Sequence, residues 1–511
     1  MKRQQTTVEH TDTLIIGAGL SGIGIAYYLQ KEQPARSFTL LEARTATGGT
    51  WDLFRYPGIR SDSDLHTFGY EFKPWVDNHA IAGADKILDY LRNTASENDI
   101  NRHIRFQHKV VKATWSTKQA CWCVEVERED TEERFSMTCN WLFSAAGYYR
   151  YDHGYTPDFE GVERFGGAVV HPQQWPEDLD YQDKQVLVIG SGATAVTLVP
   201  AMTDKAGHVT MLQRTPSYII SLPSEDVIAN TLRKWLPDDI AYSITRRKNI
   251  ALSRGIWRFC QRFPTLARKA IRYSNKRSLP ENYPVDEHFN PPYNPWDQRL
   301  CVAPDGDFFQ AISEGRASVV TDHIQTFTEK GVRLTSGQEL EADIIVTATG
   351  LNLQAFGGID MVVDGKLVDM SEKVAYKGMM LDGVPNFAFA IGYTNSSWTL
   401  KVGLLCEHFC RILAYMDQHD KSICCPTLPQ PDMPTRPLLD FGAGYVQRSL
   451  SKLPRQGLGA PWVIPMDYWV DKKLMKDGPV EDPNLRFYSA TAERRVHDTP
   501  FVQTGLQTEG A

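Results

Sequence analysis

The stretch TLIIGAGLSG (residues 13–22) decides the fold, because it joins a short apolar strand to three closely spaced glycines. Gly17, Gly19 and Gly22 form the pattern G-x-G-x-x-G. Between a strand and a helix, this spacing lets backbone N–H groups at the helix N-terminus approach a pyrophosphate. Glu42 follows about 20 residues later, where a carboxylate accepts hydrogen bonds from ribose hydroxyls. The stretch predicts an FAD-binding unit; an ordinary turn that packs a helix on a strand is the alternative.

A second stretch, QVLVIGSGATA (residues 185–195), repeats this design. Its pattern G-x-G-x-x-A is formed by Gly190, Gly192 and Ala195. The next expected strand ends in Arg214 and Thr215, where a site for unphosphorylated ribose would carry an acid. A guanidinium beside a hydroxyl binds a 2'-phosphate through charge-assisted hydrogen bonds. The second unit is therefore expected to bind NADPH, although a surface ion pair would also explain Arg214.

The rest of the chain fits around these two units. The runs WLFSAAG (141–147) and DIIVTATG (343–350) are each expected to add a strand that closes one unit. Apolar residues at helical spacing predict a buried helix over 398–416, and the proline-rich tail from about 426 is expected to wrap the surface without defining a site. We predict an α/β fold with two Rossmann-like dinucleotide-binding domains, for FAD and NADPH, and a mostly helical insertion.

The expected boundaries follow the composition of the chain. They are 1–150 for the first part of the FAD domain, 151–221 for the first part of the NADPH domain, 222–297 for the helical insertion, 298–340 for the second part of the NADPH domain, and 341–511 for the second part of the FAD domain with the C-terminal tail.

A chain that holds FAD and NADPH is expected to transfer a hydride between them. Disulfide reductases share this plan but carry a redox-active cysteine pair beside the flavin. The nine cysteines here include no C-x-x-C pair, so no redox disulfide and no metal site are expected. We therefore expect O2 to accept the electrons.

Charge and hydropathy limit the partners. A formal net charge of −7 gives the whole chain no electrostatic attraction to nucleic acid. The sequence carries no signal peptide and no apolar run of about 18 residues, so a cytoplasmic location is expected. The segment 246–277 is basic and interleaved with apolar residues, which would suit peripheral contact with an anionic membrane or an acidic domain. A solvated helical face is the alternative there.

Two longer motifs identify a family. The first, F-x-G-x-x-x-H-x-x-x-W-P, is formed by Phe165, Gly167, His171, Trp175 and Pro176. The second is GGTWDLFRYPGIRSD, at residues 48–62. Together they resemble the motifs of the type I Baeyer-Villiger monooxygenases, the class B flavoprotein monooxygenases, and the resemblance extends over nearly the whole chain. Flavin-containing monooxygenases carry a similar fingerprint without the W-P ending.

The resemblance implies a reaction and a set of site residues. Reduced FAD adds O2 at its C4a carbon, small ketones become esters, and sulfur in thioethers or thioamides is oxygenated. Arg299 stands at the position of the catalytic arginine and Asp62 at that of the aspartate that orients it. The positions that contact FAD in the family correspond to Ser21, Thr50, Trp51, Asp62 and Val110. Those that contact NADP correspond to Arg60, Ser61, Arg214 and Thr215.

Some roles stay open at this point. Many relatives place a lysine before the catalytic arginine, and this chain has Gln298 instead, which weakens the argument for strict NADPH preference. His171 either links the domains or is held by backbone hydrogen bonds, and Trp175 is expected to pack. Residues 394–397 supply helix N-cap residues that would direct a helix N-terminus at the flavin. The alternatives are an S/N-monooxygenase that forms no ester and a non-catalytic flavin redox sensor.

Overall fold

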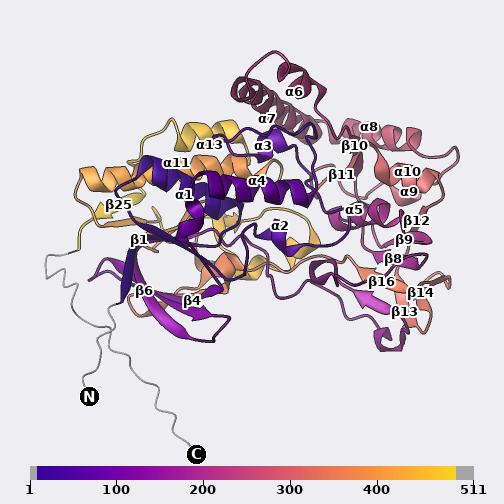
Figure 1. Ribbon diagram of the computed structural model, residues 1–511, viewed down its shortest axis with the longest axis horizontal. Coiled ribbons are helices and arrows are strands. Elements are labelled where there is room, and N and C mark those ends of the chain that lie inside the picture. The colour runs from indigo at the N-terminus through magenta and orange to yellow at the C-terminus, as the bar shows by residue number, and fades with distance from the viewer. Residues whose placement is uncertain (1–7, 491–511) are drawn as a thin grey trace, which may run out of the picture.

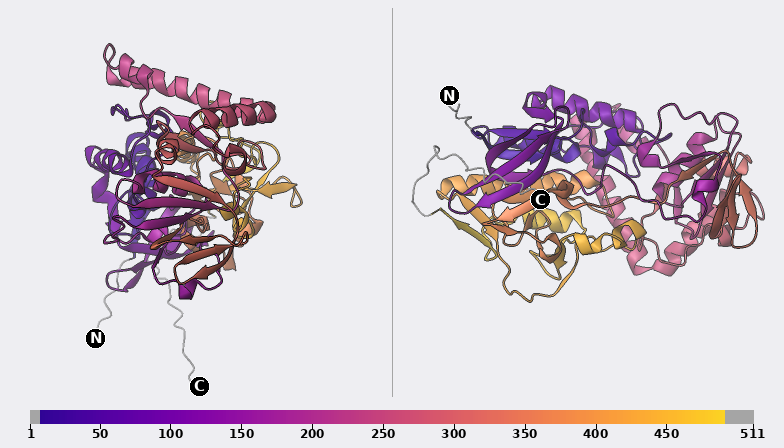
Figure 2. Two further views of the ribbon diagram at one scale, coloured as in Figure 1. Left: turned by 90° about the vertical axis from the view of Figure 1, so that its right-hand side faces the viewer. Right: turned by 90° about the horizontal axis from the view of Figure 1, so that it is seen from below.

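The computed structural model describes residues 8–490 and has two α/β units with a helical projection between them (Figure 1). The N-terminal strands and the C-terminal third form one unit, and the middle of the chain forms the other. Figure 2 shows helices α7 and α8 lying along the outside of the body. Within the described residues, no helix is long and apolar enough to cross a membrane. The predicted fold class is confirmed.

The first unit is built on one large sheet in the order β18-β17-β4-β5-β6-β1-β2-β3, with β21 also paired to β6. Strands β3, β2, β1, β6 and β21 run parallel, as in a dinucleotide-binding fold. The parallel strands are β1 (Glu9–Ile16), β2 (Phe38–Glu42), β3 (Ile104–Phe106), β6 (Arg134–Ser144) and β21 (Phe387–Phe389). The remaining strands are β4 (His108–Ser116), β5 (Cys121–Arg128), β17 (Asp360–Val363) and β18 (Lys366–Leu367).

Helices cover the parallel part of this sheet. They are α1 (Leu20–Glu32), α2 (Thr50–Leu53), α3 (Leu65–Phe68), α4 (Ala84–Glu97) and α11 (Trp398–Gln418). The buried helix predicted over 398–416 is α11, and it packs against α1. They share an apolar cluster in which Ile23, Leu405 and Phe409 are fully buried.

The second unit has a five-stranded parallel sheet in the order β12-β9-β8-β16-β7. Its strands are β7 (Ala168–Val170), β8 (Gln185–Ile189), β9 (His208–Gln213), β12 (Ala317–Thr321) and β16 (Ile344–Thr347). Its helices are α5 (Ala193–Met202) and α10 (Asp307–Ser313). An antiparallel sheet of β13 (Ile324–Thr328), β14 (Gly331–Leu334) and β15 (Glu339–Glu341), and the parallel pair β10 (Ile219–Leu222) with β11 (Cys301–Pro304), complete it.

Strand β16 corrects one expected boundary. It lies between β7 and β8 and is hydrogen-bonded to both, so residues 344–347 belong to the second unit. The boundary placed at 340–341 was therefore too early. The apolar run at 343–350 does close a nucleotide unit, but the crossing back to the first unit comes after it.

The insertion is helical, as predicted, and consists of α6 (Val227–Leu232), α7 (Asp238–Arg262), α8 (Pro264–Arg277) and α9 (Val285–His288). Buried Arg246 fixes α7 to the first unit, because its guanidinium donates to the carbonyl oxygens of His66, Thr67 and Gly69. Pro264 opens α8 after a break in the helix at Phe263.

The C-terminal segment does more than wrap the surface, which corrects the expectation from its proline content. It contains α12 (Gly444–Gln447), α13 (Tyr468–Met475) and the short strands β22 (Ile423–Pro426), β23 (Thr435–Pro437), β24 (Arg455–Gly457) and β25 (Leu485–Tyr488). Trp462 and Met475 enter the main core, and Asp471 forms a fully buried ion pair with Lys401. The hairpin β19 (Ala375–Tyr376) and β20 (Met380–Leu381) lies beside these strands.

Candidate active site

The first glycine turn is shaped for a pyrophosphate. Gly17 has φ 98°, and α1 begins just after Gly19 with no side-chain cap on its first N–H groups. A Cβ on Gly22 would lie 2.0 Å from the Gly17 carbonyl oxygen, so no side chain fits there. The uncapped N–H groups and the missing Cβ atoms fit the FAD pyrophosphate at this helix end.

Glu42 ends β2 beside this turn. Its carboxylate accepts hydrogen bonds from the backbone N–H groups of Ala18 (2.7 Å) and Arg44 (3.0 Å). Burial raises the pKa of Glu42, and these two hydrogen bonds oppose the rise. The position, at the carboxyl end of the strand next to the glycine turn, fits the ribose of FAD.

Three of the other residues expected at FAD, Ser21, Thr50 and Trp51, lie close to the same turn. The Trp398 indole N–H donates to Ser21 Oγ at 3.1 Å, Thr50 Oγ1 lies 3.3 Å from the Tyr151 hydroxyl, and Trp51 packs edge-on against Phe68. Val110 is buried in β4 opposite Val126 and shares a hydrophobic cluster with Ile16 and Leu41, the residues before Gly17 and Glu42.

We expect the substitution Gly22→Ala to weaken both folding and FAD retention. The new methyl group would overlap the Gly17 carbonyl, and such overpacking costs roughly 1–3 kcal/mol of unfolding free energy. Gly403→Ala in α11 is the matched control, since its Cβ would come no closer than 3.8 Å to another atom. Thermal unfolding and the flavin absorbance of the purified protein measure both effects. Equal behaviour of the two variants would contradict this account of the turn.

The second glycine turn has the same form. Gly190 has φ 136°, and a Cβ there would lie 2.3 Å from the Ala348 carbonyl oxygen. A Cβ on Gly192 would meet nothing within 4 Å, so open space lies before the N-terminus of α5. Ala195, in the first turn of α5, is fully buried. The open helix end fits the pyrophosphate of NADPH.

Arg214 follows β9 near this helix end. Its side chain is exposed, and no carboxylate in residues 8–490 forms an ion pair with it. The neighbouring Thr215 holds the loop, since its carbonyl oxygen accepts from Ser191 Oγ at 2.8 Å. A free guanidinium here fits a 2'-phosphate, and the surface ion pair considered as the alternative is absent from the described residues.

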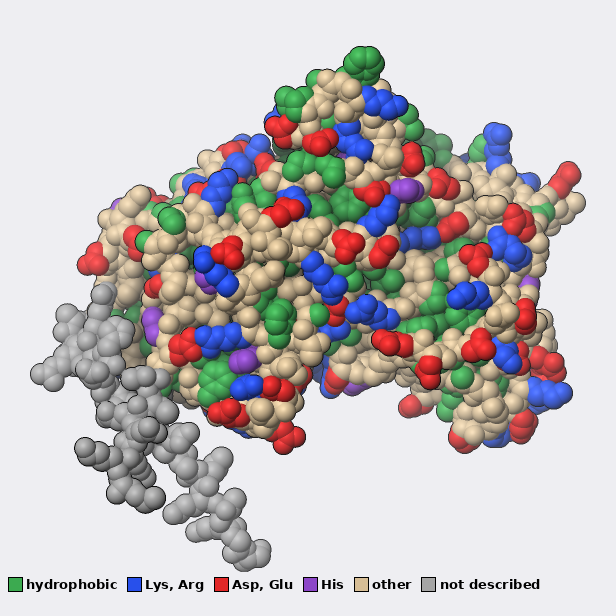
Figure 3. Space-filling view, viewed as in Figure 1, with side chains coloured by type: hydrophobic (Ala, Val, Ile, Leu, Met, Phe, Trp, Pro, Cys, Tyr) green, Lys and Arg blue, Asp and Glu red, His purple; other side chains and the backbone are tan. Residues whose placement is uncertain are grey.

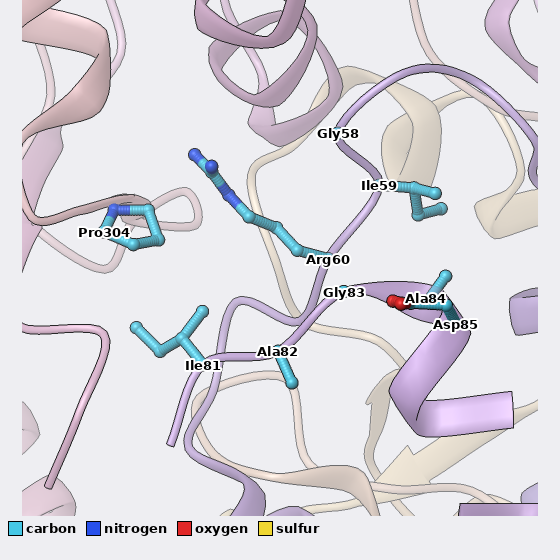
Figure 4. A pocket seen from close by; sticks show the side chains of 9 residues that line it. All are labelled: Gly58, Ile59, Arg60, Ile81, Ala82, Gly83, Ala84, Asp85 and Pro304. Atoms are coloured by element: carbon cyan, nitrogen blue, oxygen red, sulfur yellow. The ribbon is translucent and has the colours of Figure 1, made fainter. Parts of the chain in front are cut away.

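Arg60 lines a cavity of about 450 Å³ between the two units (Figure 4). The cavity walls come from residues 58–60 and 81–85 of the first unit and from Pro304 of the second. The Arg60 guanidinium forms an ion pair with Asp307 at 2.5 Å across the units. Ser61 is buried beside it, and its backbone N–H donates to the Ala82 carbonyl oxygen. Arg60 thus joins the two units, whereas the hydrogen bonds of Ser61 stay within the first unit.

Arg299 and Asp62 are also brought together from the two units. Asp62 accepts from the guanidinium at 2.8 Å and 2.7 Å, one contact to each carboxylate oxygen. Burial lowers the pKa of Arg299, but Asp62 and three nearby tyrosines outweigh it and leave the pKa above its ordinary value. The side chains remain 34% and 31% exposed, so the charged pair is not sealed inside the core.

Those three tyrosines, Tyr148, Tyr149 and Tyr445, were not predicted as site residues. The hydroxyls of Tyr148 and Tyr149 lie 3.4 Å apart, and the Tyr148 ring lies 5.2 Å from Trp398. Burial raises the pKa of Tyr148, and Arg299 opposes the rise. Tyr148 and Tyr149 directly follow the strand-ending Gly147, a position that could have signalled them. Tyr445 lies in the tail and had no such signal.

The fingerprint residues lie where the chain crosses between units. His171 bonds through Nε2 to the Gly350 carbonyl oxygen (3.1 Å), and its Nδ1 accepts from the Gln173 N–H (3.1 Å). Burial lowers the pKa of His171. Backbone groups therefore satisfy both ring nitrogens, as one of the two predictions for this histidine has it, and a role in linking the domains stays a prediction. Trp175 packs on Tyr181, as expected for a packing residue.

The remaining fingerprint positions are structural too. Phe165 is buried against Phe327, and a Cβ on Gly167 would lie 2.2 Å from the Asp343 carbonyl oxygen. The Pro176 carbonyl oxygen accepts from the Leu179 N–H. No fingerprint side chain reaches the Arg299–Asp62 pair by a described contact.

Comparison with known proteins agrees with this geometry. Residues 69–246 match the model of the flavin-binding monooxygenase-like family, and residues 15–77 match that of an NAD(P)-binding Rossmann-like domain. The chain is 52% identical to the FAD-containing monooxygenase EthA of Mycobacterium tuberculosis, over 94% of this chain and 98% of EthA. It is 46% identical to the probable FAD-binding monooxygenase AlmA of Acinetobacter baylyi, over 96% of this chain and 98% of AlmA.

Solved structures share the fold at lower identity. An oxidized steroid monooxygenase bound to NADP matches with a TM-score of 0.74 and 21% identity, over 94% of this chain and all of that one. OTEMO in complex with FAD and NADP matches with a TM-score of 0.68 and 22% identity, over 82% of this chain and 88% of that one. With its two nucleotide turns, its fold and these relatives, the chain belongs to the FAD-containing monooxygenases, NADPH-dependent flavin enzymes.

Proposed function

We propose that this monooxygenase inserts one oxygen atom of O2 into small ketones, giving esters, and also oxygenates sulfur in thioethers or thioamides. The observation that carries the proposal is the Arg299–Asp62 pair, which joins the two nucleotide-binding units and leaves a guanidinium partly open. When bound, FAD takes a hydride from NADPH and activates O2. Oxygen transfer to the substrate then depends on which charges the protein side chains stabilise.

Arg299 supplies a fixed positive charge. A guanidinium stays protonated at any working pH, and its several donors let it keep Asp62 while it binds another anion. Attack of an oxygen nucleophile on a ketone places negative charge on the former carbonyl oxygen, and a preorganised cation stabilises that charge. Ester formation needs this stabilisation, whereas sulfur oxygenation does not form an alkoxide.

Asp62 acts through Arg299 as a positioning residue. Two contacts, one to each carboxylate oxygen, hold the guanidinium plane in one orientation. Asp62 belongs to the first unit and Arg299 to the second. The ion pair therefore forms only when the two units are correctly positioned relative to each other. The same holds for Arg60 and Asp307. We infer that the two ion pairs set the relative position of the cofactors.

The N-terminus of α11 is proposed to face the flavin pyrimidine. Ser397 occupies the N-cap position, but its hydroxyl bonds to Thr67 Oγ1 at 2.6 Å and does not cap the helix. The first N–H groups of α11 therefore keep their partial positive charge for an anionic ring. A crystal structure with FAD tests this placement, and a ring bound away from the helix end would contradict it.

Product analysis tests the proposed function. The purified flavoprotein is given NADPH, O2 and either a small ketone or a thioether, and the products are identified by mass spectrometry. We expect an ester from the ketone and a sulfoxide from the thioether. Sulfoxide without any ester would favour an S/N-monooxygenase, and NADPH consumption that no substrate stimulates would favour a redox sensor.

We predict that Arg214→Ser raises the KM for NADPH by about ten- to a hundredfold, because hydrogen bonds to a charged group contribute about 1.5–3 kcal/mol. The KM for NADH should not change, since NADH has no 2'-phosphate for the guanidinium to bind. Steady-state NADPH and NADH oxidation measure the two values. A parallel loss with both nucleotides would show that Arg214 has a structural role instead.

A further inference from the structure

An apolar stripe runs along the outer face of the insertion. On α7 and at its end it consists of Ile240, Ile244, Leu252, Ile256, Phe259 and Phe263. Their side chains are between 40% and 57% exposed, and most follow one another at spacings of three or four residues. At 3.6 residues per turn, the last four of these residues lie on one side of the second half of α7, while Ile240 and Ile244 share a different side of its first half. Soluble monomers rarely leave so long an apolar face in water.

The stripe continues beyond α7. Leu266 and Tyr273 extend it on α8, and Val227 and Ile228 on α6 lie near its other end. Trp235, between α6 and α7, is 82% exposed. Figure 3 shows apolar side chains at the tip of the projection, over α6 and α7 of Figure 1. We use "apolar stripe" for the six α7 residues together with Leu266 and Tyr273.

The side of α7 that faces away from Ile240 and Ile244 is already occupied. Tyr242, Thr245, Arg246, Asn249 and Ile250 are buried against the first unit. On the next turns, Arg254 forms an ion pair with Asp467 at 2.7 Å. These contacts fix the rotation of the helix, so the apolar stripe cannot turn inward. Its exposure is a feature of the fold and not of one side-chain conformation.

Positive charge accompanies the stripe. Between Asp239 and Glu281 the sequence has eleven Lys and Arg residues and no acid. Some of these cations are neutralised, such as Lys248 by Asp226 and Arg272 by Asp286. Arg246 and Arg268 donate to neutral oxygen atoms of the protein instead. Five others form no ion pair within residues 8–490, and these are Arg247, Arg262, Lys269, Lys276 and Arg277.

We propose that the apolar stripe and these five cations dock the protein on the surface of an anionic phospholipid bilayer, with α7 and α8 lying in the plane of the interface. Aliphatic and aromatic side chains would enter the headgroup boundary, and the cations would contact lipid phosphates. The chain carries a net charge of −7, so an anionic surface repels the rest of the molecule and orients it with the insertion facing the lipid.

A second copy of the chain is the competing occupant. A two-fold dimer along the stripe would bring each cation close to its own symmetry mates. No acid between residues 240 and 280 is available to neutralise them across such an interface. Phosphate-rich lipid complements this charge pattern, and a second insertion does not. The observations therefore favour the bilayer.

Vesicle co-sedimentation of the FAD-loaded full-length enzyme tests the proposal. We expect binding to vesicles of equal parts phosphatidylcholine and phosphatidylglycerol, weak binding to pure phosphatidylcholine, and loss of binding as salt is raised. Each cation is expected to contribute on the order of fivefold to the partition coefficient. No binding to the mixed vesicles, or equal binding to both, would overturn the proposal.

Two sets of variants locate the surface. Leu252→Gln, Ile256→Gln and Phe259→Gln together should reduce partitioning at least tenfold, and so should Arg247→Gln, Arg262→Gln and Lys269→Gln together. Leu367→Gln, at a side chain 71% exposed on the far strand β18, is the matched control and should bind as the parent does. NADPH oxidation measured without vesicles should be unchanged in all three, which shows that they are folded.

Analytical ultracentrifugation separates the dimer from the bilayer. A dimer that the apolar triple variant converts to a monomer, in a protein that does not bind vesicles, would assign the stripe to self-association and overturn the proposal. A species that sediments identically in the parent and the variant, together with loss of vesicle binding in the variant alone, would support it.

Discussion

The variant Arg299→Ala is expected to oxidise NADPH but to form no measurable ester. In the parent protein this guanidinium lies between the two nucleotide units and is oriented by Asp62. Removing one preorganised charge donor of this kind costs about 3–4 kcal/mol of transition-state stabilisation, roughly a hundred- to a thousandfold in rate. Hydride transfer does not require an alkoxide to be stabilised, so NADPH should still be consumed and O2 reduced to hydrogen peroxide.

Ester formation and NADPH oxidation are measured on the same sample by gas chromatography and absorbance. Arg299→Lys is the control that keeps the charge but loses the two-point contact with Asp62. We expect partial activity from it. Full ester production by Arg299→Ala would remove this residue from the mechanism, and loss of NADPH oxidation in both variants would point to a role in nucleotide binding.

The variant Lys401→Met is expected to lose about 3–5 kcal/mol of unfolding free energy. Lys401 in α11 and Asp471 in α13 have fully buried side chains, with 2.9 Å between Nζ and Oδ1. Burial lowers the pKa of Lys401, and Asp471 opposes that fall. Without the ammonium, Asp471 keeps only the Tyr393 hydroxyl (2.7 Å) as a side-chain partner for its buried charge. An uncompensated buried carboxylate is what makes the single substitution so costly.

The double variant Lys401→Met, Asp471→Leu should recover most of this loss, because it removes both charges from the core. Lys421→Met, at an exposed lysine just after α11, should change stability by no more than about 0.5 kcal/mol. Urea denaturation followed by tryptophan fluorescence gives the three values. A single variant as stable as the Lys421 control would mean that the pair does not hold α13 against α11.

Local motifs predicted the parts of the fold that depend on a few neighbouring residues. Gly22 leaves no room for a Cβ against the carbonyl oxygen of nearby Gly17, and the spacing of these two glycines is visible in the sequence. The boundary near 340 was misplaced because β16 joins its sheet through β7 and β8, more than a hundred residues earlier for each. The residues of a strand do not indicate which distant strands it will pair with.

In the candidate site, too, some residues could be predicted from local motifs and others could not. Arg299 and Asp62 were predicted from a resemblance between long motifs, and the structure forms their ion pair. Tyr445 approaches Arg299 from a tail whose composition indicated only a surface path. The buried ion pair of Lys401 could not be predicted from the apolar pattern of its own helix, because its partner, Asp471, lies in another helix. Contacts between residues that are far apart in the sequence are explained by the folded structure, but nothing in the neighbouring sequence indicates them.

The proposed enzyme uses electrons from NADPH to transfer one oxygen atom of O2 to its substrate. Oxygen-18 labelling tests it most directly: the enzyme turns over a small ketone under labelled O2 in ordinary water, and the ester is analysed by mass spectrometry. We predict one labelled oxygen in each ester molecule and close to one ester per NADPH consumed. An unlabelled ester, or NADPH converted wholly to hydrogen peroxide with every ketone and thioether supplied, would contradict the account.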